Sequence, residues 1–238
     1  FKKLLNLPED EEVPVFQREL CEKTDISTEE KHFNDLMRFG LRVEDYLGKR
    51  IFEKRVDKSL LVEIKNISEL TEILSTNDKK NFSFYMDEFI YFAFDKDTTY
   101  VIRCKEDLFE YSFSYDAALF CFSNIFADLK IRKIVFDVKS LKHTLRKRNL
   151  LFVKPYEDVL LKEYLLRSHV NVKSISDLLG KDVPVSSYPQ YLLFLSEMQD
   201  FEIEKLDLNN LYREIELPLV EVLFDMEISG FSVDTEVL

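Results

Sequence analysis

The chain has 238 residues, a formal net charge of −12 at pH 7, and 46% apolar residues. A real hydrophobic core is therefore expected, and global disorder is excluded. The acidic balance argues against nucleic-acid binding by this chain alone, because contacts to phosphates need clustered Lys and Arg. Only four Gly are present, which disfavours a Gly-rich loop that cradles phosphates.

Cysteine and histidine usage points to no metal site and no disulfide framework. The three Cys are an odd number without CxxC spacing, which favours reduced thiols in a cytoplasmic protein. The three His lie far apart, without the spacing of a zinc site. No apolar run approaches the ~20 residues of a membrane span, so no membrane contact is expected. The chain begins at Phe1 without Met or a signal-like segment, which favours a fragment of a longer protein.

Residues 1–59 show the least regular pattern. Pro8 is followed by four consecutive acidic residues, a composition typical of a linker. A short helix is compatible with residues 32–46, where Phe33, Leu36 and Met37 are apolar. We expect 1–59 to be a linker or a short helical segment.

A pattern of short strands begins at Leu60. Residues 60–64 are typical of a strand, and Ser68 is expected to cap a helix over 69–75. Three further strands are predicted over 82–86, 89–94 and 98–104. Such close spacing predicts an antiparallel meander.

The remainder is mostly helical by its apolar period. Helices are predicted over 117–129, 140–148, 158–167, 174–179, 188–197 and 208–229, with one strand at 133–136. In the predicted helix 158–167, the apolar face is assigned to Leu160, Leu161, Tyr164 and Leu165. The face of the last helix is assigned to Leu211, Ile215, Leu219, Val222, Leu223 and Met226, with Gly230 ending it. The order predicts a mixed α/β fold, a sheet packed by helices.

One basic cluster stands out in the acidic chain. It comprises Lys139, Lys142, His143, Arg146, Lys147 and Arg148. On a helix these side chains form a candidate basic patch. The alternative interpretation is a solvated helix face, which is the common fate of a run of charges.

The segment from Leu211 to Leu238 carries several motifs at fixed offsets. They are Glu216, Pro218-Leu219, Met226-Glu227, Ser229-Gly230 and Val233-Asp234. The pattern resembles the entry into the polymerase domain of bacterial family A DNA polymerases, the DNA polymerase I type. There an E-x-P-L run precedes an apolar helix, M-E, a small pair ending in Gly, and V-D. The resemblance implies that 208–238 begin the polymerase domain on its thumb side.

Upstream segments resemble the 3′–5′ exonuclease domain of the same family. Residues 133–141 are similar to its K-V-G-x-N-x-K-x-D segment, and 154–166 to its F-D-T-x-L-x-x-Y-L-L helix. Residues 82–87 lie where its first strand carries D-x-E. The resemblance implies an RNase-H-like fold of the DEDD exonuclease type for 60–207, with a C-terminal helix leading to the polymerase domain. It also implies that 1–59 include the tail of a 5′-nuclease domain.

The family's nuclease chemistry needs several carboxylates to hold two divalent ions. The resemblance puts its first-strand Asp at Tyr85, its Glu at Asp87 and its second-motif Asp at Leu141. The final Y-x-x-x-D falls near 186–190, in a stretch without a carboxylate. Asp158 matches an acidic position that is not a metal ligand in the family. No catalytic and no metal-binding residue is therefore expected.

The acids near these positions also have simple structural interpretations. Asp87 suits a solvated strand end, and Asp137 suits a cap or turn after a strand. Asp158 suits a charge at a helix N-terminus, where the helix dipole favours it.

Three functions stay open at this point. The first is a catalytically inactive exonuclease-like domain that supports a polymerase domain in replication and repair, without a cofactor. The second is an active 3′–5′ exonuclease with shifted ligands and Mg²⁺. The third is a protein-interaction module, suggested by the acidic surface and the basic cluster. The resemblance implies the rest of the polymerase chain as partner, with DNA contacted through the parent enzyme.

Overall fold

The computed structural model describes residues 60–75, 80–104, 114–168, 172–179 and 182–230. The expectations for residues 1–59, including Cys21 and His32, lie outside the described residues. The described residues belong to one compact unit, Leu60–Leu238.

A six-stranded sheet forms the centre of this unit, in the order β1-β4-β3-β2-β5-β6. The strands are β1 (Leu60–Glu63), β2 (Asn81–Met86), β3 (Ile90–Ala93), β4 (Thr98–Ile102), β5 (Arg132–Val135) and β6 (Tyr156–Asp158). Strands β2, β3 and β4 pair antiparallel, which confirms the predicted meander. Strand β1 pairs parallel with β4, and β5 pairs parallel with both β2 and β6.

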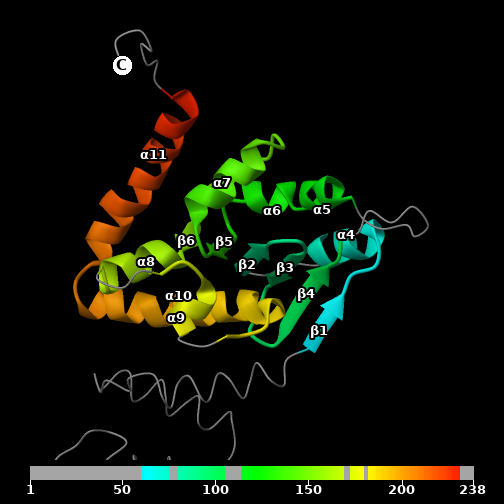
Figure 1. The fold of residues 1–238 in the computed structure, drawn as a ribbon, viewed down its shortest axis with the longest axis horizontal. Coiled ribbons are helices and arrows are strands. Elements are labelled where there is room, and N and C mark those ends of the chain that lie inside the picture. Colours follow the sequence, from blue (N-terminus) through cyan, green and yellow to red (C-terminus); the bar gives the residue numbers. More distant parts are fainter. Residues whose placement is uncertain (1–59, 76–79, 105–113, 169–171, 180–181, 231–238) are drawn as a thin grey trace, which may run out of the picture. The chain divides into compact units, whose positions relative to one another are not determined.

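Helices surround the sheet (Figure 1). They are α4 (Ile67–Ser75), α5 (Tyr115–Cys121), α6 (Ser123–Ala127), α7 (Val138–Arg146), α8 (Val159–Leu166), α9 (Ile175–Leu179), the 3₁₀-helix η1 (Val185–Ser187), α10 (Tyr188–Lys205), the π-helix η2 (Leu211–Glu216) and α11 (Leu217–Ser229). Helices α4 to α7 lie over one face of the sheet, and α10 runs along the other (Figure 1).

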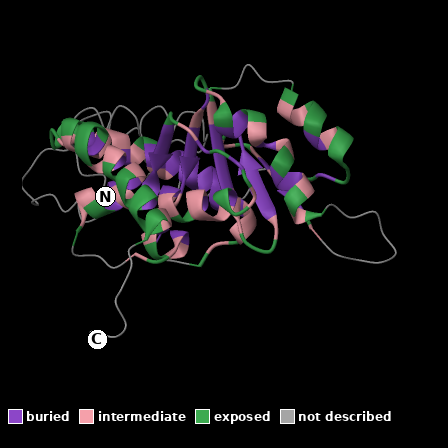
Figure 2. Cartoon of the chain, turned by 90° about the horizontal axis from the view of Figure 1, so that it is seen from above, coloured by how far each residue is buried: buried purple, intermediate pink, exposed green. Residues whose placement is uncertain are grey.

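The core lies mainly between the sheet and helices α4 to α7. Phe82, Phe84 and Phe92 are buried there and contact Phe122 and Phe126, with ring centroids 5.0–6.3 Å apart. The strands inside the sheet are largely buried, whereas the edge strand β1 and the outer helix surfaces are exposed (Figure 2). The high Phe content of the sequence is thus used in one aromatic core.

Strand β6 was not predicted. It contains only three residues, two of them acidic, so it lacks the apolar alternation that marks a strand. Its residues are nevertheless all buried, because the strand extends the sheet beside β5.

Several helix starts differ from the prediction. Helix α4 begins at Ile67, and the side chain of Asn66, not Ser68, accepts the Glu69 N–H at 2.8 Å. Helix α7 begins at Val138, capped by Asp137, so Ser140 does not open it. Both helices therefore begin two residues earlier than predicted, after an Asx cap; for α7 the cap is Asp137, which was itself a predicted cap or turn residue.

The predicted helix 117–129 is in fact two short helices, α5 and α6. Phe122 ends the first and begins the second, and its buried ring lies in the core. Phe120 and Leu129, two of the apolar residues of the predicted helix, are exposed, and Leu129 lies beyond the end of α6.

The predicted inner face of helix α11 was wrong, and that of α8 was right only in part. In α8 Leu161 and Leu165 pack against the core as predicted, but Tyr164 is exposed and the buried residues are Val159, Lys162 and Glu163. In α11 they are Leu217, Val220 and Phe224, and the predicted stripe from Ile215 to Met226 is exposed. Gly230 does end α11 with a positive φ of 62°, as predicted. Helix α10 extends eight residues past its predicted end at Glu197, to Lys205.

Candidate functional site

Tyr85 stands near the end of β2, on the sheet face that packs against α10. Its ring meets that of Tyr188, the first residue of α10, edge to face at a centroid distance of 4.8 Å. Burial raises the pKa of the Tyr85 phenol, and the neighbouring Tyr188 and Asp87 add to the rise. Tyr85, expected at the family's first-strand Asp position, is thus an aromatic side chain that packs on α10.

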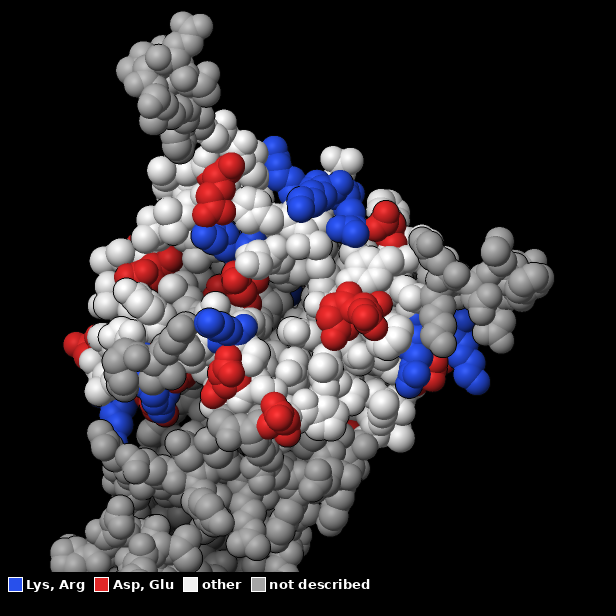
Figure 3. Space-filling model, viewed as in Figure 1, with Lys and Arg blue, Asp and Glu red and all other residues white. Residues whose placement is uncertain are grey.

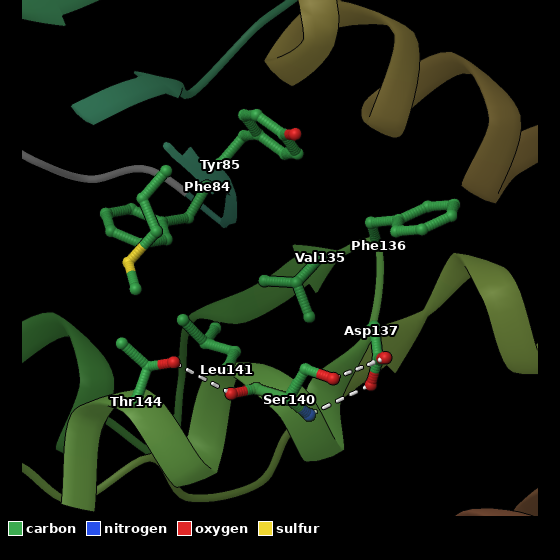
Figure 4. A pocket seen from close by; sticks show the side chains of 9 residues that line it. Phe84, Tyr85, Val135, Phe136, Asp137, Ser140, Leu141 and Thr144 are labelled. Atoms are coloured by element: carbon green, nitrogen blue, oxygen red, sulfur yellow. Dashed lines mark hydrogen bonds between the residues drawn. The ribbon is translucent and has the colours of Figure 1, made fainter. Parts of the chain in front are cut away.

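Leu141 and Tyr85 border the same pocket, a cavity of about 180 Å³ at the ends of β2 and β5 (Figure 4). The pocket is lined by Phe84, Tyr85, Met86, Val135, Phe136, Asp137, Ser140, Leu141 and Thr144. Leu141 comes from the buried side of α7, and the Tyr85 ring points away from it toward α10. The structure therefore brings two of the sequence-predicted positions to one pocket, and neither position carries a carboxylate.

Asp137 is the sole acid in the lining of this pocket. Its Oδ1 accepts the Ser140 N–H at 3.0 Å, and its Oδ2 accepts the Ser140 hydroxyl at 2.7 Å (Figure 4). Both oxygens thus serve the cap of α7, as expected for an acid that follows a strand. Thr144 donates its hydroxyl to the Ser140 carbonyl at 3.1 Å, so it too is engaged locally.

Asp87 lies in the turn between β2 and β3 and is exposed. Its Oδ1 accepts the Phe89 N–H at 2.9 Å, and its carbonyl accepts the Tyr115 hydroxyl at 3.1 Å. It does not line the pocket between Tyr85 and Leu141. Its contacts are those of a turn residue at a strand end.

Asp158 is a buried carboxyl that joins two helix starts. Its Oδ1 accepts the Leu161 N–H of α8 at 3.0 Å, and its Oδ2 accepts the Val138 N–H of α7 at 2.9 Å. Burial raises the pKa of Asp158 to about 7, against the effect of these N–H donors. The expected helix-terminal role is present, but the side chain lines a different cavity from that of Tyr85.

The residues at this site do not fit a two-metal centre. Two divalent ions need several carboxylate oxygens free to coordinate them. The pocket offers Asp137 alone, with both oxygens accepting hydrogen bonds from Ser140. In the described part of the chain, no three His, Cys, Asp or Glu side chains gather closely enough to hold a metal ion.

The candidate basic patch is divided among several ion pairs. Lys139 and His143 of α7 both contact Glu227 of α11, each at 2.7 Å, and Lys142 pairs with Glu221. Arg148 pairs with Asp116 of α5 at 2.5 Å. Arg146 and Lys147 are exposed at the end of α7. Figure 3 shows Lys and Arg in small groups interrupted by acidic and uncharged surface on the face in view.

A buried charged cluster was missed from the sequence. The ammonium of Lys162, which is fully buried, lies 2.8 Å from Glu157 Oε2 and 2.6 Å from Asp200 Oδ1. Glu157 also pairs with Arg132 at 3.0 Å and accepts the Tyr212 hydroxyl at 3.1 Å. The one available signal was that Lys162 interrupts an apolar helix.

This cluster joins five elements of the fold, β5, β6, α8, α10 and η2. Burial alone would raise the pKa of Glu157, but Lys162 and Arg132 lower it to about 2. Tyr212 of η2 donates to Glu157 and also accepts the Asp158 N–H at 3.1 Å. The π-helix that precedes α11 is thereby attached to β6, while Asp200 attaches α10 to α8.

Two further observations bear on the protein's class. Cys104 and Cys121 are free thiols, and burial raises the pKa of both. None of the helices in the described ranges combines the length and apolar character needed to cross a bilayer.

No family model matches the chain. A curated relative is DNA polymerase I of Caldicellulosiruptor bescii, 31% identical over 116 residues, which amounts to 44% of this chain and 14% of that protein. This chain therefore spans about one seventh of the relative's length.

Solved structures share the fold. The POL domain of Pol1 from M. smegmatis, in complex with DNA primer-template and dNTP, matches with a TM-score of 0.57 and 20% identity, over 72% of this chain and 33% of that one. NrnC of Brucella melitensis with bound Mg²⁺ matches with a TM-score of 0.51 and 11% identity, over 75% of this chain and 96% of that one. The predicted RNase-H-like mixed α/β fold is confirmed, and the comparisons together support a relationship to DNA polymerase I.

Proposed function

We propose that this chain is a piece of a DNA polymerase I-type protein. Residues 60–207 form a 3′–5′ exonuclease-like domain without catalytic activity, and 208–238 begin the polymerase domain. Residues 1–59 are a linker or the tail of a 5′-nuclease domain. The domain supports the polymerase part in replication and repair, in the cytoplasm, and contacts DNA only through the parent enzyme.

The contact between Tyr85 and Tyr188 carries this proposal. In the family resemblance these residues fall on the first-strand Asp and on the final motif, which are distant in sequence. Here the two rings meet edge to face with centroids 4.8 Å apart, and Leu141 lines the adjoining pocket. Aromatic and aliphatic side chains thus occupy the place where the chemistry would need carboxylates.

The supporting role follows from how the exit helix is held. Helix α11 contacts α7 through Glu221 and Glu227, and η2 contacts the sheet through Tyr212. A helix fixed at its start and along one side leaves the domain in a defined direction. That is what a structural module needs in order to position a neighbouring domain.

Incubation of this chain with a 3′-labelled and a 5′-labelled single-stranded DNA, in Mg²⁺ and separately in Mn²⁺, tests the inactivity. We expect no stepwise shortening from the 3′ end. Metal-dependent cleavage abolished by Asp87→Ala or Asp137→Ala would instead establish the alternative, an active exonuclease with shifted ligands. Only under that alternative is Mg²⁺ a cofactor.

The assignment to a polymerase is tested separately. The parent polypeptide, expressed in full, is expected to extend a primer on a DNA template. Failure to extend would remove the polymerase relationship and leave a protein-interaction module as the remaining hypothesis.

A further inference from the structure

Helix α11 and the end of η2 carry a row of exposed apolar side chains. We call Ile215, Leu219, Val222 and Met226 the outer stripe. Their exposed fractions are 57%, 40%, 52% and 62%, on the side away from the buried Val220 and Phe224. Four large apolar side chains in one row on a small acidic protein mark a contact surface.

The spacing of the outer stripe is that of a helix-pairing seam. Its members follow one another at intervals of four, three and four residues. This is the a and d pattern through which one helix packs its side chains between those of another. The shape of the surface therefore suits an α-helix as occupant.

A groove adjoins the outer stripe and deepens it. It is a cavity of about 450 Å³ between the start of α7, α8 and α11. Its apolar lining consists of Leu160, Leu161, Tyr164, Val172, Val220 and Leu223. Leu223 of the groove lies one helical turn after Leu219 of the stripe, so the groove adjoins the stripe and can receive a bulky apolar side chain.

The charges beside the outer stripe select a basic occupant. Helix α11 contains Glu221, Asp225 and Glu227 and no Lys or Arg. Glu221 and Glu227 are engaged by α7. Within the described ranges, no Lys or Arg pairs with Glu216 or Asp225, which flank the stripe on opposite sides. A second copy is disfavoured, because its acidic flanks would meet these acids and each chain already carries a net charge of −12.

We propose that the outer stripe and the adjoining groove dock a basic, amphipathic α-helix from the part of the parent polypeptide outside these 238 residues. This source rests on the proposed function. Both polymerase relatives extend far beyond the matching region, since the match covers 14% of one and 33% of the other. The partner helix carries apolar residues at heptad spacing and Lys or Arg beside them.

The surface is tested with two synthetic helical peptides of about 18 residues, a length at which a helix persists in water. Both have Leu at the seam, and the flanks are Lys in one and Glu in the other. This chain is expected to bind the Lys peptide at least about tenfold more tightly. Val222→Asp and Met226→Asp should abolish binding, while Leu129→Asp, at an exposed apolar residue elsewhere, should not.

The thermal unfolding midpoints of all three variants should match that of the unsubstituted 238-residue chain, because the substituted side chains are exposed. Equal affinity for both peptides, or none for either, overturns the proposal. So does dimerisation of this chain in sedimentation runs that Val222→Asp abolishes, because the occupant is then a second copy.

The source is tested by amide hydrogen exchange of residues 217–229 in this chain and in the parent polypeptide. Exchange should slow at least about tenfold in the parent, since a docked helix opens less often. Equal exchange overturns the internal source. If exchange slows in a parent polypeptide that cannot extend a primer, the docking surface is supported and the proposed polymerase function is contradicted. Failure of the docking proposal and failure of the proposed function are therefore distinguishable.

Discussion

Tyr85 and Tyr188 meet edge to face, with ring planes at 81° and centroids 4.8 Å apart. The contact joins the end of a central strand to the first turn of the longest described helix. Tyr188 also shares a hydrogen bond of 3.0 Å with Ser176 of α9. The pair therefore links the end of β2 to the start of α10 and, through Ser176, to α9.

Replacing Tyr85 with Asp should destabilise the domain and restore no nuclease activity. The ring contact is lost and a charge is placed beside Asp87 in a half-buried position, at a cost of roughly 1–3 kcal/mol. Urea unfolding measures the change. Tyr85→Phe is the control and should stay within about 1 kcal/mol, because it keeps the ring. If Tyr85→Asp is as stable as the unsubstituted chain, the pocket still accommodates a carboxylate.

Replacing Glu157 with Gln should destabilise the domain by ~3–5 kcal/mol, because it leaves Lys162 buried with one fewer charge partner. Glu88→Gln, at an exposed position, is the matched control and should change little. The measurement is urea unfolding at neutral pH. A small effect at Glu157 would mean that Asp200 alone compensates Lys162.

The same carboxyl predicts an acid limit of stability. The folded-state pKa of Glu157 is about 2, below its ordinary value of 4.5. Its contribution is complete above pH 4.5 and is lost as the pH falls toward 2. As the pH is lowered through that window, the unfolding midpoint of the unsubstituted chain should fall steeply, and that of Glu157→Gln should fall less steeply.

Asp158 predicts that, in a higher pH range, folding stability decreases as the pH rises. Its folded-state pKa is about 7, above its ordinary 3.8, so the folded protein binds the extra proton. Stability from this group is greatest below pH 3.8 and declines as the pH rises to 7, by up to ~4 kcal/mol. Asp158→Asn should flatten the decline between pH 5 and pH 7. Superimposable pH profiles for the two proteins would rule out a raised pKa.

The contact between Lys142 and Glu221 should couple α7 to α11. A double-mutant cycle with Ala at both positions is expected to give a coupling free energy of ~0.5–2 kcal/mol, because Lys142 is largely buried. The pair of Lys96 and Glu197, more exposed at its carboxylate, serves for comparison and should give ~0.2–1 kcal/mol. A vanishing value for the first pair would mean that α11 is held by its apolar contacts alone.

The meander and the order of elements were accessible from the sequence because they depend on local patterns. Strands β2 to β4 combine aromatic and β-branched residues with a short turn at Asp95, whose side chain accepts the Asp97 N–H at 2.9 Å. Asp137 could likewise be assigned as a cap, since a cap is made within three residues. Such features need no knowledge of distant partners.

The face of α11 and the buried charges of α8 were not accessible from the sequence, for a physical reason. Periodicity assumes that apolar residues face the core. In α8 the buried Lys162 is compensated by Glu157 and Asp200, which come from two other elements. In α11 the apolar stripe is exposed and Glu221 reaches Lys142 instead. Tertiary ion pairs decided both orientations, and no local pattern reports them.

The candidate site was only partly predictable. Tyr85 and Leu141 do border one pocket, but their roles depend on an alignment. The third member of the arrangement, Tyr188, was expected at the start of helix 188–197 and within the stretch 186–190 where the family's final motif falls, but not in contact with Tyr85. Its contact with Tyr85 depends on how α10 crosses the sheet.

The π-helix η2 sets the rotational phase of everything that follows it. A π-helical turn holds more residues than an α-helical turn, so it acts like an insertion into a continuous helix. If 211–216 became a regular α-helix without losing a residue, α11 would turn by about 100° relative to Tyr212. Glu221 and Glu227 would then leave α7, and the apolar stripe would change direction. Deleting one residue from 211–216 should instead give a regular α-helix that keeps α11 in its present orientation. The extra residue held in the π-helical turn therefore determines which way the chain continues.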